Sequence, residues 1–147
     1  MKEKKKHRVL VEGPVQANFI ADSIASHSAK TSIGAHDIFL GQVRNDFINQ
    51  KEVVAIDYSA YAEMAEDVFH TIREEAFERF QLSCMHIYHS IGRVKAGEIG
   101  LFVFVSAPHR NAAFDACRWI VEQIKEKAPV WGKEIFADDT HSWKINT

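Results

Sequence analysis

The sequence has few of the residues that staple small domains together or interrupt a folded chain. Its 147 residues include two cysteines, three prolines and seven glycines. Cys84 and Cys117 stand far apart and form no CxxC pair, which excludes a disulfide framework and does not match the usual spacing of zinc ligands. We therefore expect two reduced, packed thiols, as is typical of cytosolic proteins.

Long hydrophobic runs and a dominant charge are also absent. No segment approaches the roughly 20 apolar residues that span a bilayer. The formal net charge of -2 gives no general electrostatic reason to expect binding to nucleic acid or to a membrane surface. The basic start, MKEKKKHR, leads into an apolar stretch too short for a signal peptide. We expect a soluble cytoplasmic protein with a disordered basic tail over residues 1–7, in which any anion site is local.

The hydrophobic content of 46% is sufficient for one domain over residues 1–147. Apolar periodicity predicts helices over residues 16–27, around 65–80 and from about 111 to 127, and strands over 8–12, 35–44, 53–60, 82–91 and 99–107. The segment GRVKAGE, with two glycines, is expected to form the turn between the last two strands. This mixed order predicts an α+β domain with a mostly antiparallel sheet. The very apolar strand LFVFVSA belongs either in the core or at an interface.

One candidate site is SAPHRNAAF, residues 106–114, where His109 and Arg110 stand between an apolar strand and a helix. The first N–H groups of a helix attract anions, and an arginine adds a fork suited to phosphate or carboxylate. The alternative is that Asn111 caps the helix while His109 and Arg110 face water. The residues alone leave both interpretations open.

A second candidate site is IKEKAPVWGKEIF, residues 124–136. Lys125 adjoins Ile124 on the expected buried stripe, so it belongs at the edge of the core face. We expect Trp131 to bury itself and fix the turn after the helix. A lysine held on such a partly desolvated segment has its pKa lowered, as a nucleophile or general base requires. The alternative is a lysine that only complements the helix dipole.

The histidines give little indication of a metal site. On a strand, His86 and His89 point to opposite faces. Asp138, Asp139 and His141 lie in a loop without a second group of ligands. We therefore expect no bound metal.

Five segments in series resemble one family. They are GAHDIFLGQVR, DYSAYAEMAE, IGRVKAGE, VSAPHRNAAFDAC and IKEKAPVWGKE, and the likeness extends over roughly residues 34–143. The sequence resembles the large, catalytic subunit of molybdopterin synthase. The resemblance implies an α+β fold of the α/β hammerhead type. It also implies a homodimer with a small ubiquitin-like sulfur-carrier subunit at each end, which makes a heterotetramer.

The resemblance further implies a sulfurtransferase of molybdenum cofactor biosynthesis that needs no cofactor of its own. The Gly-Gly end of the carrier, present as a thiocarboxylate, would transfer sulfur twice to cyclic pyranopterin monophosphate and form the dithiolene of molybdopterin. Lys125 matches the essential lysine of the family, and Lys133 is expected to share its catalytic work. The positions that match substrate-binding residues are Gln42, Val43, Arg44, His109, Arg110, Gly132 and Glu134.

The sequence departs from the family pattern after the tryptophan. Family members usually read PxWKKE or PxWKRE, whereas Gly132 replaces the first of these lysines. We expect the flexible Lys133 to deliver its ammonium to the same place and Lys127 to face solvent. Ser59 and Ser90 replace a common glutamate and a common arginine, which changes details of the pocket more than the fold.

Two other readings of the function stay open. One is a catalytically impaired homologue that still binds the carrier because only the chemistry is lost with Gly132. The other is a phosphate-binding module that is unrelated to sulfur and is supported only by His109 and Arg110.

Overall fold

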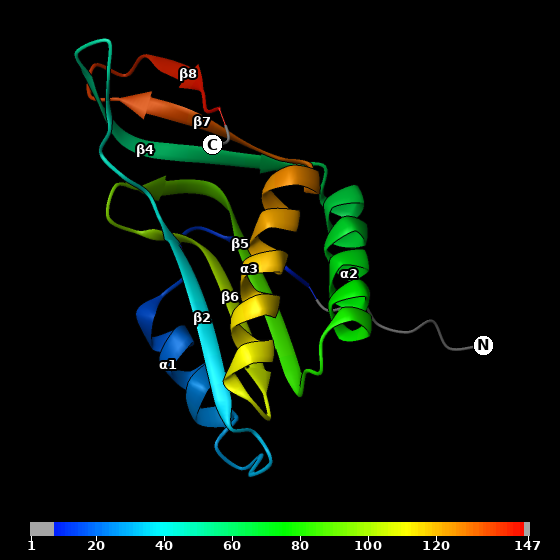
Figure 1. Ribbon diagram of the computed structural model, residues 1–147. Helices are drawn as coiled ribbons and strands as arrows, with labels where there is room; N and C mark the ends of the chain where they lie inside the picture. Colours follow the sequence, from blue (N-terminus) through cyan, green and yellow to red (C-terminus); the bar gives the residue numbers. More distant parts are fainter. Residues whose placement is uncertain (1–7, 146–147) are drawn as a thin grey trace.

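The computed structural model describes residues 8–145, so the expected disorder of the tail at 1–7 lies outside the described residues. Helices pack on both faces of one sheet (Figure 1). The elements are β1 (Leu10–Glu12), α1 (Ala17–Ser26), β2 (Ala35–Gln42), β3 (Phe47–Ile48), β4 (Lys51–Ala60), α2 (Ala62–Arg79), β5 (Cys84–Lys95), β6 (Ile99–Ala107), α3 (Arg110–Lys127), β7 (Val130–Phe136) and β8 (His141–Trp143). The predicted α+β class is confirmed.

The sheet has the order β2-β6-β5-β4-β7-β8 along its main path. Its neighbours are antiparallel, and the short strand β1 adds a parallel pairing with β5. The mostly antiparallel sheet expected from the sequence is therefore confirmed. Among the described residues, no helix is both long enough and apolar enough to cross a bilayer.

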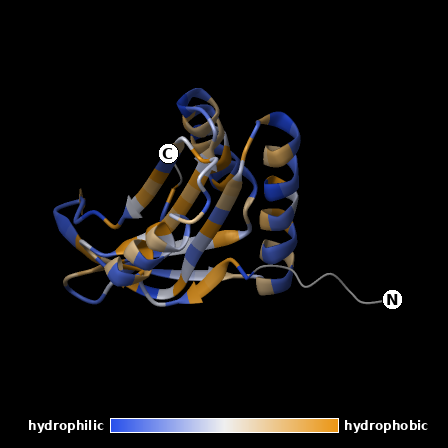
Figure 2. Ribbon diagram, turned by 90° about the horizontal axis from the view of Figure 1, so that it is seen from below, coloured by the Kyte–Doolittle hydropathy of each residue, from blue (hydrophilic) through white to orange (hydrophobic). Residues whose placement is uncertain are grey.

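Strand β6 forms the centre of the core, because its two faces are covered by different helices. Leu101, Val103 and Val105 belong to the cluster that includes the inner faces of α2 and α3. Phe102 and Phe104 pack on the other face with Ile20 of α1. Hydrophobic residues accordingly concentrate along the strands in Figure 2. The segment LFVFVSA thus fills the core, which answers one of the questions left open by the sequence.

The predicted end of strand β5 was wrong. Strand β5 does not end at Ile91 but runs on to Lys95, passing through Gly92 at a φ of 84°. A Cβ at Gly92 would also lie 2.9 Å from a carboxylate oxygen of Glu12, so glycine suits both the backbone and the space. Beyond this point β5 leaves β6 and pairs with β4.

Helix α3 begins one residue earlier than predicted. His109 is its N-cap residue, with extended backbone angles and no capping hydrogen bond from its side chain. Asn111 therefore lies inside the helix and does not cap it. His109 and Arg110 are both exposed.

Candidate active site at the end of helix α3

A small pocket opens where the last turn of α3 meets strands β4 and β7. Helix α3 ends at Lys127 because Ala128, held extended at φ -71° and ψ 127°, precedes Pro129. The chain then enters β7, which pairs antiparallel with β4. The residues that line the pocket are Tyr58, His89, Ile124, Lys125, Ala128, Val130, Gly132 and Lys144.

Lys125 lies in this pocket, at the edge of the buried face of α3 as the helical spacing predicted. Partial burial, followed by the nearby charge of Lys144, lowers the pKa of its amine. The residue as a whole is nevertheless exposed, so the partly desolvated amine belongs at the rim of the pocket. A lysine in this setting releases its proton more readily than one in water.

Two aromatic side chains form the inner wall. Burial is the main reason that the pKa of His89 falls to about 4, and Lys125 lowers it further, while the His89 Nδ1 atom lies 2.8 Å from the carbonyl of Ser90. Burial, followed by the carboxylate of Glu134, raises the pKa of Tyr58. Both rings are therefore uncharged near neutral pH, and the two lysines supply the charge of the pocket.

Gly132 faces the pocket, and its neighbours occupy the space that a side chain would need. A Cβ built at Gly132 would lie 3.0 Å from Cγ2 of Ile56 and 3.3 Å from Cε1 of Tyr58. Glu134 lies two residues further along β7, on the same face of the strand, and is buried. A lysine at position 132 would therefore be in tight contact with Ile56 and Tyr58, which would have to shift by a few tenths of an ångström.

Lys133 faces away from this pocket. Residues 130–136 form strand β7, where a turn was predicted, and neighbouring side chains on a strand point to opposite faces. Lys133 pairs with Asp57 and Trp143 in the ladder, and its charge contributes, after that of Arg93, to the lowered pKa of Asp57. The expectation that Lys133 reaches the place of the missing lysine is not supported by this geometry.

Trp131 shares the outer face with Lys133. Its side chain is 43% exposed and makes an edge-on contact with Tyr61 at 5.0 Å between ring centroids. The prediction that Trp131 is buried was wrong, because the inward positions of β7 are taken by Val130 and Gly132. Lys127 is exposed, as predicted.

Lys144 is the residue that the sequence analysis missed. It directly follows β8, and its backbone N–H donates to the carbonyl of Gly132 over 2.8 Å. Its side chain lines the pocket with Lys125. No local pattern in HSWK indicates this contact, since it depends on the pairing of β8 with β7.

The residues matched near the end of β2 lie outside the pocket lining. Val43 is buried with Ile56 and Val94. Gln42 is exposed, and Arg44 is exposed and forms an ion pair with Asp46 at 3.2 Å.

His109 and Arg110 are far from Lys125 within one chain. They stand at the opposite end of α3, and the 15 residues from Arg110 to Lys125 correspond to about 22 Å of helix. In Figure 1 the last turn of α3 meets the start of β7, whereas the first turn of α3 lies at the far end of the sheet. The two candidate sites of the sequence analysis are therefore separate within the monomer.

Side chains of the kind that bind metals meet elsewhere. His86 and His89 point to opposite faces of β5, as predicted, but His86 meets His27 and Cys84 on the face covered by α1. The sequence analysis did not anticipate this group, because His27 is remote from the other two in the chain.

Comparison with known proteins gives consistent results. The sequence model of the family described as MoaE protein matches residues 14–127. A molybdopterin synthase catalytic subunit from Pyrococcus abyssi is 42% identical over 134 residues, which cover 91% of this chain and 88% of that protein. The protein of the same name from Rattus norvegicus is 34% identical and is matched over 77% of this chain and 56% of its own length.

Solved structures agree with the sequence comparison. Molybdopterin synthase from Staphylococcus aureus superposes with a TM-score of 0.82 at 29% identity and covers 97% of this chain and 99% of that chain. A complex of subunits 1 and 2 of molybdopterin-converting factor from Helicobacter pylori has a TM-score of 0.78 at 16% identity, covering 92% and 88%, which supports the fold.

Proposed function

The chain belongs to the MoaE protein family, and on this basis we propose that it is the catalytic subunit of a molybdopterin synthase. It takes sulfur from the thiocarboxylated end of a small ubiquitin-like carrier and transfers it to cyclic pyranopterin monophosphate in the cytoplasm. The observation that carries the proposal is the pocket at the end of α3. Lys125 and Lys144 line this pocket together with Gly132, the position where the family pattern has a lysine.

The chemistry of this transfer suits a pocket whose lining has two amines and, among the residues that the structure describes, no acidic side chain. The sulfur of the thiocarboxylate forms a bond to a substrate carbon while a C–O bond of that carbon breaks: in one transfer the oxygen of the cyclic phosphate leaves, and in the other a hydroxyl takes up a proton and leaves as water. The carrier is then held as a thioester. Water adds to the acyl carbon, the acyl C–S bond breaks, the sulfur stays on the substrate as a thiolate, and the carrier leaves as a carboxylate. Lys125, with its lowered pKa, accepts the proton of this water.

Lys144 stabilises the negative charge that both reaction partners carry. The thiocarboxylate and the phosphate of the substrate are anions, and a fixed cation beside the reacting atoms lowers the energy of the charged transition state. We assign to Lys144 the part that a lysine at position 132 plays in the family pattern. The wall of the pocket supports this assignment, since a Cβ at position 132 would be in tight contact with Ile56 and Tyr58.

We further propose that the active unit is a homodimer that binds two carriers. His109 and Arg110 match substrate-binding positions, yet in one chain they lie about 22 Å along α3 from Lys125. A second copy of the chain can bring its own His109 and Arg110 to this pocket. Gln42, Arg44 and Glu134 remain proposed contributors to substrate binding.

A reconstituted turnover assay tests the main proposal. The purified protein is mixed with thiocarboxylated carrier and cyclic pyranopterin monophosphate, and molybdopterin is followed as its fluorescent oxidised derivative. We expect product from the natural protein and almost none from Lys125→Ala, with unchanged carrier binding in both. Full turnover by Lys125→Ala would remove the central assignment.

Mixing two inactive variants tests the dimer. If each site takes Lys125 from one copy and Arg110 from the other, a dimer of one Lys125→Ala and one Arg110→Ala chain contains one intact site. After random exchange of equal amounts, about half of the dimers are mixed, and each mixed dimer has one intact site of its two. About a quarter of the natural activity should therefore return. No recovery after proven exchange would place both residues of a site on the same copy, and full activity of Arg110→Ala alone would show that Arg110 is not needed.

One observation favours a second candidate function. With Gly132 in place of the usual lysine, the chain would be a homologue that binds the carrier without catalysis. This second candidate predicts normal carrier binding but no product from the natural protein. The main proposal predicts carrier binding together with product formation.

A further inference from the structure

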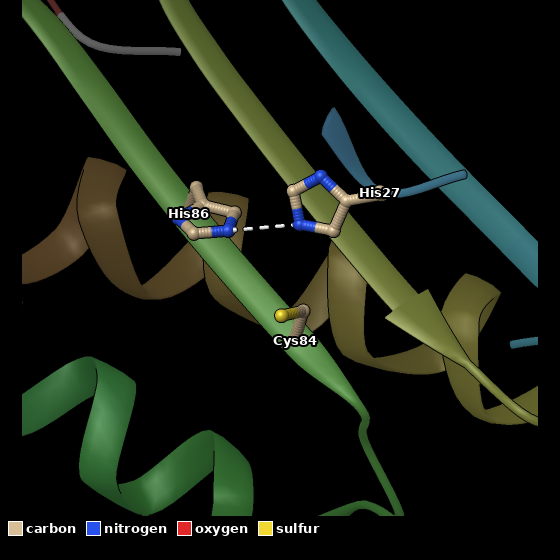
Figure 3. A group of neighbouring side chains, drawn as sticks. All are labelled: His27, Cys84 and His86. Carbon is tan, nitrogen blue, oxygen red and sulfur yellow. Dashed lines mark hydrogen bonds between the residues drawn. The ribbon is translucent and has the colours of Figure 1, made fainter. Parts of the chain in front are cut away.

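Three side chains with metal-binding atoms converge on the face of the sheet that α1 covers. His27 follows the last turn of α1, and Cys84 and His86 project from the same face of β5 (Figure 3). Their ligand atoms all lie within 4.8 Å of one another. His27 is buried, and Cys84 and His86 are partly exposed, so solvent reaches one side of the group.

The distances between these atoms are close to those of a tetrahedral zinc site. Zinc–nitrogen and zinc–sulfur bonds of the usual length place two nitrogens about 3.3 Å apart, and a nitrogen and a sulfur about 3.6 Å apart. The Nε2 atoms of His27 and His86 are 3.1 Å apart. Shifts of about an ångström at most would therefore bring all three atoms onto one ion.

The hydrogen bonds of His27 orient it as a ligand. Its Nδ1 lies 2.7 Å from the backbone carbonyl of Ser23, and a carbonyl oxygen only accepts, so Nδ1 carries the proton. Nε2 then presents its lone pair toward His86 and Cys84. Metal-binding histidines are held in this way, with the second nitrogen bonded to a backbone carbonyl.

The other two residues can exchange their present contacts for a metal. The Nε2–H of His86 now donates to His27, and binding a metal through Nε2 requires the other neutral tautomer of His86, with its single ring proton on Nδ1. The exposed Lys30 donates to the Cys84 sulfur over 3.0 Å and is free to swing away into water. Two neutral imidazoles and one thiolate are a ligand set that suits zinc.

We propose that His27, Cys84 and His86 form a site for a zinc-class divalent ion that leaves its fourth position open to solvent. The ion would link the end of α1 to β5. This site lies on the opposite face of β5 from His89 and the Lys125 pocket, and no step of the sulfur transfer depends on it.

Metal titration of the full chain tests the site. Untagged protein, stripped with a chelator and kept reduced, is titrated with Zn²⁺ against a chromophoric chelator and separately with Co²⁺. We expect one equivalent of either metal and a thiolate-to-cobalt charge-transfer band. Cys84→Ser should abolish the band. Both Cys84→Ser and His86→Gln should weaken zinc binding by more than the about 10–100-fold typical of changes to residues that only hydrogen-bond a metal ligand.

Two control variants keep the test specific. His70→Gln removes a partly exposed histidine that lies 3.6 Å from Glu74 on helix α2, away from the proposed site. Cys117→Ser removes the other thiol, which burial keeps protonated by raising its pKa to about 12. Both should bind zinc like the natural protein, and zinc should raise Tm in the controls but not in Cys84→Ser.

Two results would contradict the proposed zinc site. Absence of stoichiometric zinc binding to the natural protein, or equal binding by Cys84→Ser and His86→Gln, would show that the His27–His86 contact is an ordinary hydrogen bond. The turnover assay is independent of this result, because it reports on the other face of the sheet.

Discussion

Replacing Lys144 by alanine removes one of the two lysines that line the pocket at the end of α3. The contact that holds this segment in place is made by the backbone, from the N–H of Lys144 to the carbonyl of Gly132, and alanine keeps it. We therefore expect the variant to fold like the natural protein and to bind the carrier, while turnover falls.

The size of the fall follows from the position of the side chain. Removing one preorganised donor from an enclosed oxyanion site costs about 10²–10³ in kcat. Lys144 is only half-buried, so solvent already screens part of its charge. We expect the lower end of this range, about 100-fold in kcat, which corresponds to about 2.7 kcal/mol of transition-state stabilisation.

The same variant should change the pH dependence of the reaction. The positive charge of Lys144 disfavours the charged form of Lys125 and so helps to lower its pKa. Without Lys144 the pKa of Lys125 rises, and because the neutral amine is the proposed base, the acidic limb of the kcat/KM profile moves to higher pH. A loss of packing alone would lower turnover without moving this limb.

Lys133 provides the matched control for this experiment. Lys133→Ala removes the same charge one residue from Gly132, but on the outer face of β7, so near-natural turnover is expected. Lys144→Arg, which keeps the charge, should recover part of the activity. Normal turnover by Lys144→Ala together with inactive Lys133→Ala would refute the reasoning and identify Lys133 as the replacement lysine.

Three further predictions concern Gly132 and His89, which line the same pocket, and Ser90, which follows His89 in β5. Gly132→Lys should lower the free energy of unfolding by about 1–3 kcal/mol in urea titrations, because its Cβ would crowd Ile56 and Tyr58, and it should not raise turnover. The pKa of His89 is about 4 in the folded protein against 6.5 for the free group, so between these pH values the unfolded chain binds more protons than the folded one. The free energy of unfolding should therefore be at its full value above pH 6.5 and fall by about 3 kcal/mol as the pH drops toward 4. His89→Gln should reduce this loss in urea titrations at different pH values. Ser90 is buried, and its Oγ has no hydrogen-bond partner among the residues that the structure describes, so Ser90→Ala should be neutral or stabilising by up to about 1 kcal/mol in thermal unfolding.

The sequence predicted the features that depend on helical periodicity. Residues at intervals of three and four share a face, so the buried stripe of α3 that contains Ile124 could be predicted. The same spacing put Lys125 beside Ile124 and so at the rim of the pocket. These predictions needed no knowledge of which other element packs against the helix.

The position of Lys133 could not be predicted, because it depends on strand register. Residues 130–136 contain a glycine and follow a proline, so they resembled a turn until pairing with β4 made them a strand. On a strand a shift of one residue moves a side chain to the other face, and Lys133 is one residue from the position that faces the pocket. A lysine side chain, although flexible, does not reach from one face of a sheet to the other.

Lys144 and the group around His27 were missed for a related reason. Lys144 reaches the pocket through the pairing of β8 with β7, and His27 and His86 are 59 positions apart. Neither contact leaves a local pattern, since both arise from the order of strands and the placement of α1. The short spacing in the sequence pairs His86 with His89, but these two residues lie on opposite faces of β5 and cannot share a metal ion.

The separation of His109 and Arg110 from Lys125, in contrast, follows from the sequence once α3 is accepted. A helix of 18 residues holds its two ends apart at a fixed rise per residue, and nothing short of breaking it brings them together. If residues at both ends contact one substrate, the second set must come from another chain. Under that condition the length of α3 requires an active site shared between two copies of the chain. The mixed-variant experiment uses Lys125 and Arg110 because these residues lie near the two ends of α3.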